Sequence, residues 1–313
     1  MSPSCLAGVL ALSAAAPLPP RPMFQWKFEP GRTFYIETAT ETQQEMTVLG
    51  NKVPQTQAQV FTFSLTPERQ LADGTWLIKQ RIIGVRMSLD LGGQRIEFDS
   101  TKPGQGDNPL SDFLRGAVGA EFRLHLGRAK GVVAVEGREE LLRRLGEARP
   151  EIKPLLQTIL TEQALKEMNG QTFAALPARG VYKGDVWQRR SRRDLGPFGA
   201  YEMTHRYTLL GTKGTYEVFT VEVTDVHYEA PTQGDSTLPF KILKADLKGS
   251  GREGEMRFDR ERGRVVRVET RLTLEGDLSV EIGGQETKMG LKQEQKTTVR
   301  TLDTNPLEEP RPK

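Results

Sequence analysis

The chain has 313 residues, of which 36% are hydrophobic, and its 44 basic and 41 acidic side chains leave a net charge of +3. This length is enough to bury a core without disulfides. The charge is too balanced to imply a nucleic-acid or anionic-membrane partner, and no nucleic-acid partner is expected. Counting the 31 glycines restores an ordinary globular composition, as expected of antiparallel sheets with one polar face.

An apolar stretch opens the chain. Leu6–Ala16 has the length of the hydrophobic region of a signal peptide, is too short to span a bilayer, and ends in small residues. No basic residue precedes it, which a misplaced start codon would explain; a mildly apolar tail is the alternative interpretation. We expect residues 1–16 to be an export signal. The mature protein then lacks Cys5, the only cysteine, and with it any disulfide, cysteine zinc site or cysteine nucleophile.

Residues 17–137 are expected to form a first β-rich half. Gln57–Leu65 and Thr75–Leu91 are rich in β-forming residues in alternation with polar ones. The second run ends in Gly92-Gly93, which predicts a two-residue type I′ turn because glycine adopts positive φ at both central positions. This turn pairs Met87 with Phe98, and Leu89 with Ile96, on one apolar face.

A near-identical octapeptide predicts a second hairpin of the same kind. Leu278–Gln285 resembles Met87–Gln94 and places Gly283-Gly284 at its turn. The same rule sets Val280 opposite Thr287 and Leu278 opposite Met289.

Residues 138–170 break the β pattern and predict a helical connector. Arg138–Arg149 carries helix formers and Glu/Arg pairs four residues apart, and Glu151–Met168 carries an apolar stripe that ends at Asn169-Gly170. A shorter helix is expected at Pro109–Val118, where proline occupies the first turn.

Residues 171–302 are expected to form the second β-rich half, followed by a disordered tail at residues 303–313. Gly214 suits a three-residue hairpin loop that sets Gly211 opposite Thr215. Extending that pairing places Tyr207 opposite Phe219, His205 opposite Val221, and Tyr201 opposite Asp225. The predicted fold class is therefore mainly β (α+β), with two β-rich halves of curved antiparallel sheet joined by a helical segment.

Four polar residues of the second half are predicted to share one face, namely Tyr201, His205, Asp225 and His227. A general base and its orienting carboxylate must lie within hydrogen-bond reach, and this register separates His205 from Asp225 by two rungs. We therefore favour a structural role. Asp225 and His227 alone do not complete a metal site, because no third His or Cys lies nearby, and no metal or cofactor is expected.

The aromatic residues are more suggestive. Phe24, Trp26 and Phe28 alternate strictly, and Trp76 and Trp187 each follow a turn. Large side chains on a curved sheet either fill a core or line a cavity for an apolar ligand, and the core is the default interpretation.

The opening Trp26, Phe28 and Gly31, the helical insert and the Lys183–Trp187 element resemble a family of exported bacterial proteins of unknown function. That family is similar in architecture to periplasmic lipoprotein carriers, in which a curved half-barrel encloses an acyl chain. The resemblance implies a fold and an exported location in the periplasm, in the cell envelope or outside the cell. It implies no catalytic residues.

The sequence therefore predicts a non-catalytic, exported protein of the cell envelope that binds or carries an apolar, lipid-like ligand. A structural or protein-interaction module of the envelope is the first alternative, with another envelope protein as partner, and a secreted hydrolase using His205 and Asp225 is the second. The oligomeric state stays open. The candidate ligand-binding residues are Trp26, Trp76, Tyr201, His205, Asp225 and His227.

Overall fold

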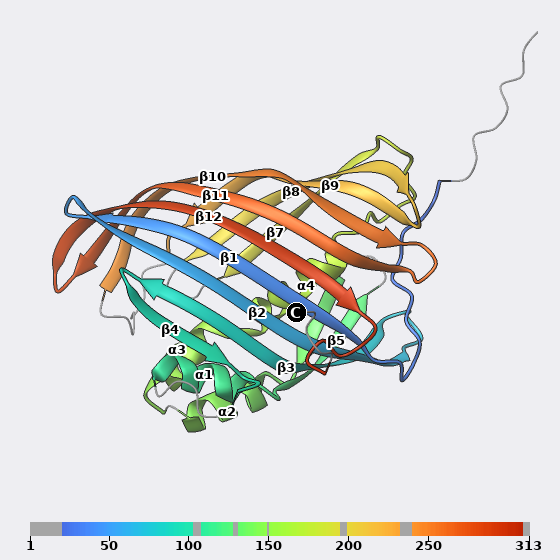
Figure 1. The fold of residues 1–313 in the computed structure, drawn as a ribbon, viewed down its shortest axis with the longest axis horizontal. Helices are drawn as coiled ribbons and strands as arrows, with labels where there is room; N and C mark the ends of the chain where they lie inside the picture. The colour runs from blue at the N-terminus through green and yellow to red at the C-terminus, as the bar shows by residue number, and fades with distance from the viewer. Residues whose placement is uncertain are drawn as a thin grey trace, which may run out of the picture.

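The computed structural model describes residues 21–102, 108–127, 131–148, 150–194, 199–231 and 240–308. The predicted export signal and Cys5 lie outside these residues, as do residues 309–313 of the predicted tail. The described residues form mainly β structure, one open antiparallel sheet of twelve strands with four short helices (Figure 1), which confirms the predicted fold class. No helix among them is both long and apolar enough to cross a membrane.

The strands are β1 (Phe34–Val48), β2 (Asn51–Gln70), β3 (Trp76–Leu91), β4 (Gln94–Asp99), β5 (Glu121–Gly127), β6 (Gly131–Glu136), β7 (Val186–Asp194), β8 (Ala200–Lys213), β9 (Tyr216–Glu229), β10 (Phe240–Asp259), β11 (Arg264–Ile282) and β12 (Gln285–Leu302). The helices are α1 (Pro109–Ala117), α2 (Arg138–Ala148), α3 (Lys153–Ile159) and α4 (Glu162–Ala174), with a 3-10 turn at Pro150–Ile152.

A single sheet runs through both halves of the chain. Its order is β6-β5-β3-β2-β1-β12-β11-β10-β9-β8-β7, and β4 pairs with β3. The first and last long strands, β1 and β12, pair from Tyr35 opposite Leu302 to Val48 opposite Met289. Strands of 18 to 20 residues, such as β2, β10 and β12, are on the order of 60 Å long.

Both glycine-pair hairpins form as predicted. Gly92 and Gly93 have φ of 59° and 95°, and Gly283 and Gly284 have φ of 58° and 81°. Met87 pairs with Phe98 and Val280 pairs with Thr287, as the turn chemistry requires. All these turns lie at the same end of the sheet as the β1–β2 turn, on the left in Figure 1.

The helical connector begins as predicted, but its second helix is divided. Thr161 interrupts it, because its side chain accepts a hydrogen bond from the Ala164 backbone N–H at 3.0 Å and so begins a new helix, α4. Helix α4 then continues through Asn169-Gly170, which was predicted as a stop. The Asn169 amide donates to the Leu165 carbonyl 2.8 Å away, so this residue bonds back onto the helix instead of ending it.

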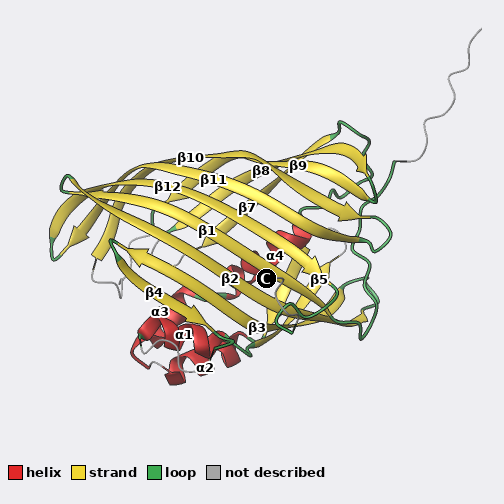
Figure 2. Ribbon diagram, in the orientation of Figure 1, coloured by secondary structure: helices red, strands yellow, loops and turns green. Residues whose placement is uncertain are grey.

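Helix α4 lies between the two edges of the sheet. It contacts β6 at one edge and β7 at the other. In Figure 2 it is the red helix seen behind the yellow central strands. Just beyond its end, the Ala175 carbonyl accepts from the Trp187 indole at 3.2 Å and the Leu176 carbonyl accepts from the Arg189 guanidinium at 3.1 Å. Because one short helix reaches both edge strands, the sheet must curve strongly around it. The helix thereby covers part of the β6 and β7 edges, which would otherwise be exposed.

The predicted register of the β8–β9 hairpin is wrong. Lys213 pairs with Tyr216 across a two-residue turn at Gly214-Thr215, and Tyr207 lies opposite Val221 instead of Phe219. Two further irregularities occur between Leu209 and Gly211 and between Thr204 and His205. A β-bulge adds a residue on one strand and shifts all later pairs, so extrapolation from the turn fails beyond it.

Candidate functional site

One face of the central strands carries no charged side chain. Phe34 and Leu65 pair across β1 and β2 and pack with the helices, so this side of the sheet is the inner face. Alternate residues of a strand point to opposite faces. The register of β1, β2, β11 and β12 therefore places every charge of Phe34–Met46, Val53–Leu65, Val268–Ile282 and Gln285–Val299 on the other side, the outer face. These charged residues are Glu37, Glu41, Glu45, Glu269, Arg271, Glu275, Asp277, Glu281, Glu286, Lys288, Lys292, Glu294 and Lys296.

The middle of the inner face is polar but neutral. Thr40 lies between Gln59 of β2 and Thr297 of β12. The Gln57 side-chain amide donates to the side-chain oxygen Oε1 of Gln59 at 3.2 Å, and the Gln295 side-chain amide donates to the Thr297 hydroxyl at 3.2 Å. Because these polar groups bond to one another, an apolar molecule lying against them would leave few of them without a partner.

We call Thr40, Gln57, Gln59, Gln295 and Thr297 the neutral band. Apolar side chains flank it on both sides. On the β2 side, Phe61 and Phe63 stack with ring centroids 6.2 Å apart and are only partly buried. On the β8–β11 side a cluster of buried residues is edged by partly exposed Met203, Leu272, Leu278 and Leu291. The buried members of that cluster are Val223, Val226, Tyr228, Leu247 and Leu274. The inner face therefore presents apolar surface that the helices do not bury.

Tyrosines of the inner face remain neutral. The rings of Tyr201 and Tyr228 lie 5.0 Å apart. Burial raises the pKa of Tyr228 to about 12, and burial likewise raises the pKa of Tyr201. Both hydroxyls are therefore protonated at physiological pH and add no charge to this wall.

At the end opposite the glycine turns, an extended segment, Phe24–Phe28, joins the two halves of the core. Phe24 is 2% exposed and packs edge-on against Phe219 and Phe258 of the second half, with ring centroids 5.2 and 5.4 Å away. Trp26 contacts the Phe173 ring of α4 at 4.9 Å. We name Phe24–Phe28 the aromatic segment.

The far end of the aromatic segment reaches the first half. Phe28 stacks on Trp26 at 5.8 Å and contacts Trp76 at the start of β3 at 5.5 Å. Backbone bonds from Lys27 N–H to the Gly263 carbonyl and from Val181 N–H to the Pro22 carbonyl hold the segment in place. Its aromatic rings therefore fill this end of the sheet.

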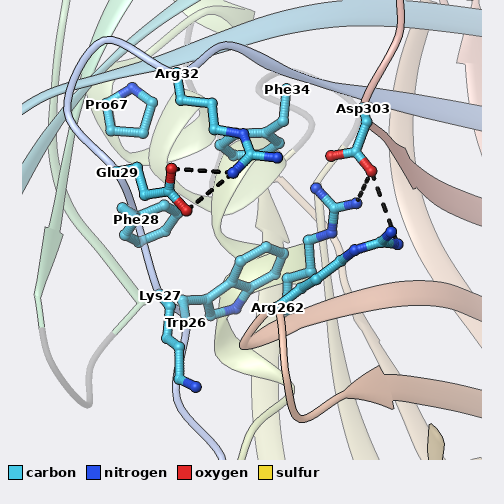
Figure 3. Close-up of a pocket in the computed structure, with 10 residues that line it drawn as sticks. Trp26, Lys27, Phe28, Glu29, Arg32, Phe34, Pro67, Arg262 and Asp303 are labelled. Atoms are coloured by element: carbon cyan, nitrogen blue, oxygen red, sulfur yellow. Dashed lines mark hydrogen bonds and ion pairs between the residues drawn. The ribbon is translucent and has the colours of Figure 1, made fainter. Parts of the chain in front are cut away.

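A small hollow of about 70 Å³ lies beside Trp26 (Figure 3). Asp303 accepts a hydrogen bond from Arg264 at 2.8 Å and lies 3.7 Å from Arg262, while Glu29 pairs with Arg32 at 3.0 Å. This volume corresponds to about two water molecules. The hollow is too small for a lipid. Its ion pairs at Asp303 hold the end of β12 to the start of β11 and to the turn before it, while Lys27 ties the aromatic segment to that turn through hydrogen bonds to the Arg260 and Glu261 carbonyls.

The ion pair at Asp303 predicts a dependence of stability on pH. The hydrogen bond from Arg264 lowers the pKa of Asp303 below its ordinary value. A folded-state pKa below the unfolded one stabilises the fold at pH above about 4, and this contribution is lost as the pH falls through the folded-state pKa. Asp303→Asn is expected to lower the Tm at neutral pH, with a difference from wild type that shrinks as the pH falls below the ordinary aspartate pKa and through the lowered folded-state pKa.

Thermal unfolding followed across this pH range tests that expectation. Glu41→Gln, which removes an exposed carboxylate of the outer face, is the matched control and should leave the Tm nearly unchanged. A constant Tm difference between Asp303→Asn and wild type at every pH would contradict the assignment.

A larger hollow, of about 490 Å³, lies over the central strands and is lined mostly by outer-face residues. Its charged members are Glu41, Arg252, Arg271, Glu294 and Lys296. Charged walls disfavour an apolar ligand, because the ligand would displace water from them without replacing its hydrogen bonds. The outer hollow is therefore a poor match to the predicted ligand.

Four of the predicted site residues lie on the inner face or at the aromatic end, but they do not gather into one site. Trp26 and Trp76 meet through Phe28. Tyr201 and His205 share the inner face of β8, where the His205 ring stacks on Tyr207 at 6.4 Å.

The predicted placement of Asp225 and His227 beside them is wrong. Both are exposed on the outer face, since their neighbours Val226 and Tyr228 are the buried ones. His205 pairs with Val223 and Thr204 with Asp225, so Thr224 is an extra residue that reverses the alternation of β9. His205 and Asp225 thus lie on opposite faces, and the geometry that the hydrolase alternative requires is absent.

Sequence reasoning missed the neutral band itself. Gln55, Gln57 and Gln59 alternate in β2, and Gln293 and Gln295 alternate in β12, with charges in the intervening positions only of β12. The alternation of neutral and charged residues could be seen in the sequence. That these residues form one surface could not be predicted, because this depends on the pairing of β1 with β12, the first and last strands of the fold.

A family model described as a family of unknown function (DUF6263) matches residues 73–265. No curated protein gives a significant match to the chain.

Similar solved structures have low identity and low TM-scores. Lipovitellin, in a structure on lipid–protein interactions, gives a TM-score of 0.43 at 9% identity and covers 91% of this chain, which spans only 27% of lipovitellin. An outer membrane channel from Pseudomonas putida F1 gives 0.23 at 9% identity, covering 89% of this chain and 98% of the channel. A DUF1329 family protein from Desulfovibrio piger gives 0.13 at 9% identity, covering 82% and 83%. These scores do not identify a shared fold.

Proposed function

Because the chain belongs to DUF6263, a family of unknown function, we propose a function from its own geometry: it is a non-catalytic, exported protein of the cell envelope that binds an apolar, lipid-like ligand on the inner face of its sheet. The observation that carries this proposal is the separation of charge. Along Phe34–Met46, Val53–Leu65, Val268–Ile282 and Gln285–Val299 the inner face of the four central strands is neutral, while the outer face holds every charged residue of these stretches.

A lipid-like ligand matches this surface better than a polar one. Partly exposed Phe61, Leu272 and Leu291 offer apolar contact, and each buried methylene of a ligand contributes about 0.8 kcal/mol. The neutral band of Gln and Thr can accommodate ester or hydroxyl groups. Strands on the order of 60 Å long exceed the ~30 Å hydrocarbon thickness of a bilayer, so a whole acyl chain can lie along them.

The non-catalytic part of the proposal rests on the site residues. His205 and Asp225 lie on opposite faces of the sheet, and no cluster of three or more His, Cys, Asp or Glu suited to a metal ion occurs among the described residues. Export is supported by Leu6–Ala16 of the sequence.

Native mass spectrometry of the protein purified from envelope extracts tests the proposal directly. A carrier is expected to retain a lipid mass that organic extraction removes. Recovery of a stoichiometric partner protein and no lipid would support the alternative, an interaction module of the envelope.

A charge placed on the inner face is expected to abolish ligand binding. In Gln59→Glu the new carboxylate can still accept the hydrogen bond from Gln57, so the fold is preserved, but it must lose water against an acyl chain. We expect the affinity for a fluorescent fatty acid to fall about a hundredfold, since an unpaired buried charge costs several kcal/mol.

Gln43→Glu is the matched control, because Gln43 is exposed on the outer face of the neighbouring strand. It should bind the fatty acid as wild type does. Equal losses in both variants, or no loss in Gln59→Glu, would place the ligand elsewhere.

A further inference from the structure

Exposed apolar side chains gather at the end of the sheet that holds the glycine turns. Half of the large apolar residues that are exposed in the described part of the chain lie there. We name this set the hairpin-tip surface; it consists of Leu49, Val53, Leu91, Leu243 and Ile282. In Figure 1 the β1–β2, β3–β4 and β11–β12 turns all point to the left of the molecule, away from the aromatic segment.

Leu49 is the most unusual member of this surface. Its side chain is 81% exposed and its φ is +50°, while Gly50 beside it has φ of +81°. It is the one residue other than glycine with positive φ among the described residues. A type I′ turn favours Asn or Gly at this position, and the left-handed conformation disfavours a leucine. A side chain that is 81% exposed gains little from packing within the described part of the fold, so we infer that Leu49 serves an external partner.

The hairpin-tip surface is continuous with the inner face. Met46 of β1 pairs with Val53 on one side and with Leu291 on the other, and Leu278 pairs with Met289. Met46, Leu278, Met289 and Leu291 are only partly buried. An apolar path therefore runs from the cluster edged by Leu272 to the turns, whereas rings fill the opposite end.

Charges near the turns cancel. Within four residues of the three turns and in the first five residues of β10, the basic and acidic residues are equal in number. They are Lys52, Arg95, Lys241, Lys244 and Lys288 against Glu45, Asp90, Glu97, Glu281 and Glu286. Three ion pairs form among them, including Lys52 with Glu45 at 2.8 Å and Lys241 with Glu281 at 3.7 Å. The partner of this surface is therefore recognised through apolar contact rather than through charge.

We propose that the hairpin-tip surface docks on a lipid bilayer by inserting Leu49 and its apolar neighbours into the interfacial region, so that an apolar ligand passes between the membrane and the inner face. The passage of a ligand to the inner face rests on the proposed function, whereas the docking does not. Short apolar projections that enter the headgroup and acyl boundary bind neutral membranes in proportion to the apolar area that they bury.

Flotation of the full chain with vesicles of neutral phosphatidylcholine tests the proposal. Wild type is expected to float with the vesicles to the same extent at low and high salt. Leu49→Asn is expected to reduce binding about tenfold, as a lost apolar side chain would. Because asparagine suits the left-handed position, this variant should also be as stable as wild type or more so. Leu49→Asn combined with Ile282→Asn should not float at all.

Leu210→Asn is the matched control, since Leu210 is also exposed, at 47%, but lies in β8 near the opposite end of the sheet. It should float as wild type does. Failure of wild type to float, or undiminished flotation of the double variant, would overturn the proposal. Concentration-dependent dimerisation without vesicles, abolished by Leu49→Asn, would also overturn it and would assign the surface to a second copy of the chain.

The fluorescent fatty acid, measured without vesicles, separates this proposal from the proposed function. Leu49→Asn should bind the fatty acid as wild type does, because Leu49 lies outside the inner face. Flotation without fatty-acid binding would sustain the docking and remove the carrier function. Fatty-acid binding without flotation would sustain the carrier function and remove the docking.

Discussion

Replacing Phe24 by alanine is expected to lower the free energy of unfolding by about 3–5 kcal/mol, the cost of deleting a buried phenylalanine. Phe24 is 2% exposed and packs edge-on against Phe219 and Phe258, and both of these rings are themselves fully buried. Its loss would leave a cavity between rings that strands β9 and β10 hold in place. Chemical denaturation should show a lower midpoint with little change in slope.

Met23→Ala is the control for this experiment, since Met23 precedes Phe24 and is 58% exposed. Its expected effect is within about 0.5 kcal/mol. If Phe24→Ala were as mild, the aromatic segment would be a loosely attached strand rather than part of the core. A change in slope would instead indicate that the end of the sheet opens separately from the rest.

The second large effect is expected at Gly276, where alanine should destabilise the fold by about 3 kcal/mol. The φ of Gly276 is +152°, and an added Cβ would lie 2.0 Å from the Asp246 carbonyl oxygen of β10. That oxygen belongs to the backbone of the neighbouring strand, so it can move only if the pairing of Leu247 with Gly276 is disturbed. Thermal unfolding should show a drop of many degrees.

Gly283→Ala separates the conformational strain of a positive φ from the steric clash of the added Cβ. Gly283 also has positive φ, at 58°, but an added Cβ there meets open space. Only the conformational cost of about 1 kcal/mol is expected. Similar losses in the two variants would mean that strain alone matters at Gly276 and that β10 and β11 can separate at little cost.

The hairpins could be predicted from the sequence because their signals are local. Gly92-Gly93 and Gly283-Gly284 admit few conformations, and the pairs that they set, such as Met87 with Phe98, follow directly from the turn. The prediction for the β8–β9 hairpin was wrong already at its turn, because Gly214-Thr215 forms a two-residue turn where a three-residue loop was expected. Bulges beyond Leu209 and at Thr224 depend on how strands pack in three dimensions, and they moved Asp225 to the outer face.

The helical connector shows the same division. Glu/Arg spacing located α2, because side chains four residues apart meet on one helix. The start of α4 at Thr161 also has a local signal, since threonine is a preferred N-cap residue. It was overlooked because the apolar stripe of Glu151–Met168 indicated one continuous helix. The continuation past Gly170 was not readable, since α4 is stabilised by packing against β6 and β7 rather than by its own propensity.

Local chemistry, then, specified the class of fold, the tight turns and the alternation of neutral with charged residues, because turn geometry and side-chain alternation act within a few positions. The assembled sheet specified the site. The pairing of β1 with β12 unites strands about 250 residues apart, and only that union collects glutamines and threonines from both halves into one neutral wall. Strand pairing between residues so far apart in sequence cannot be predicted from local β-propensity, because it depends on burial across the whole molecule.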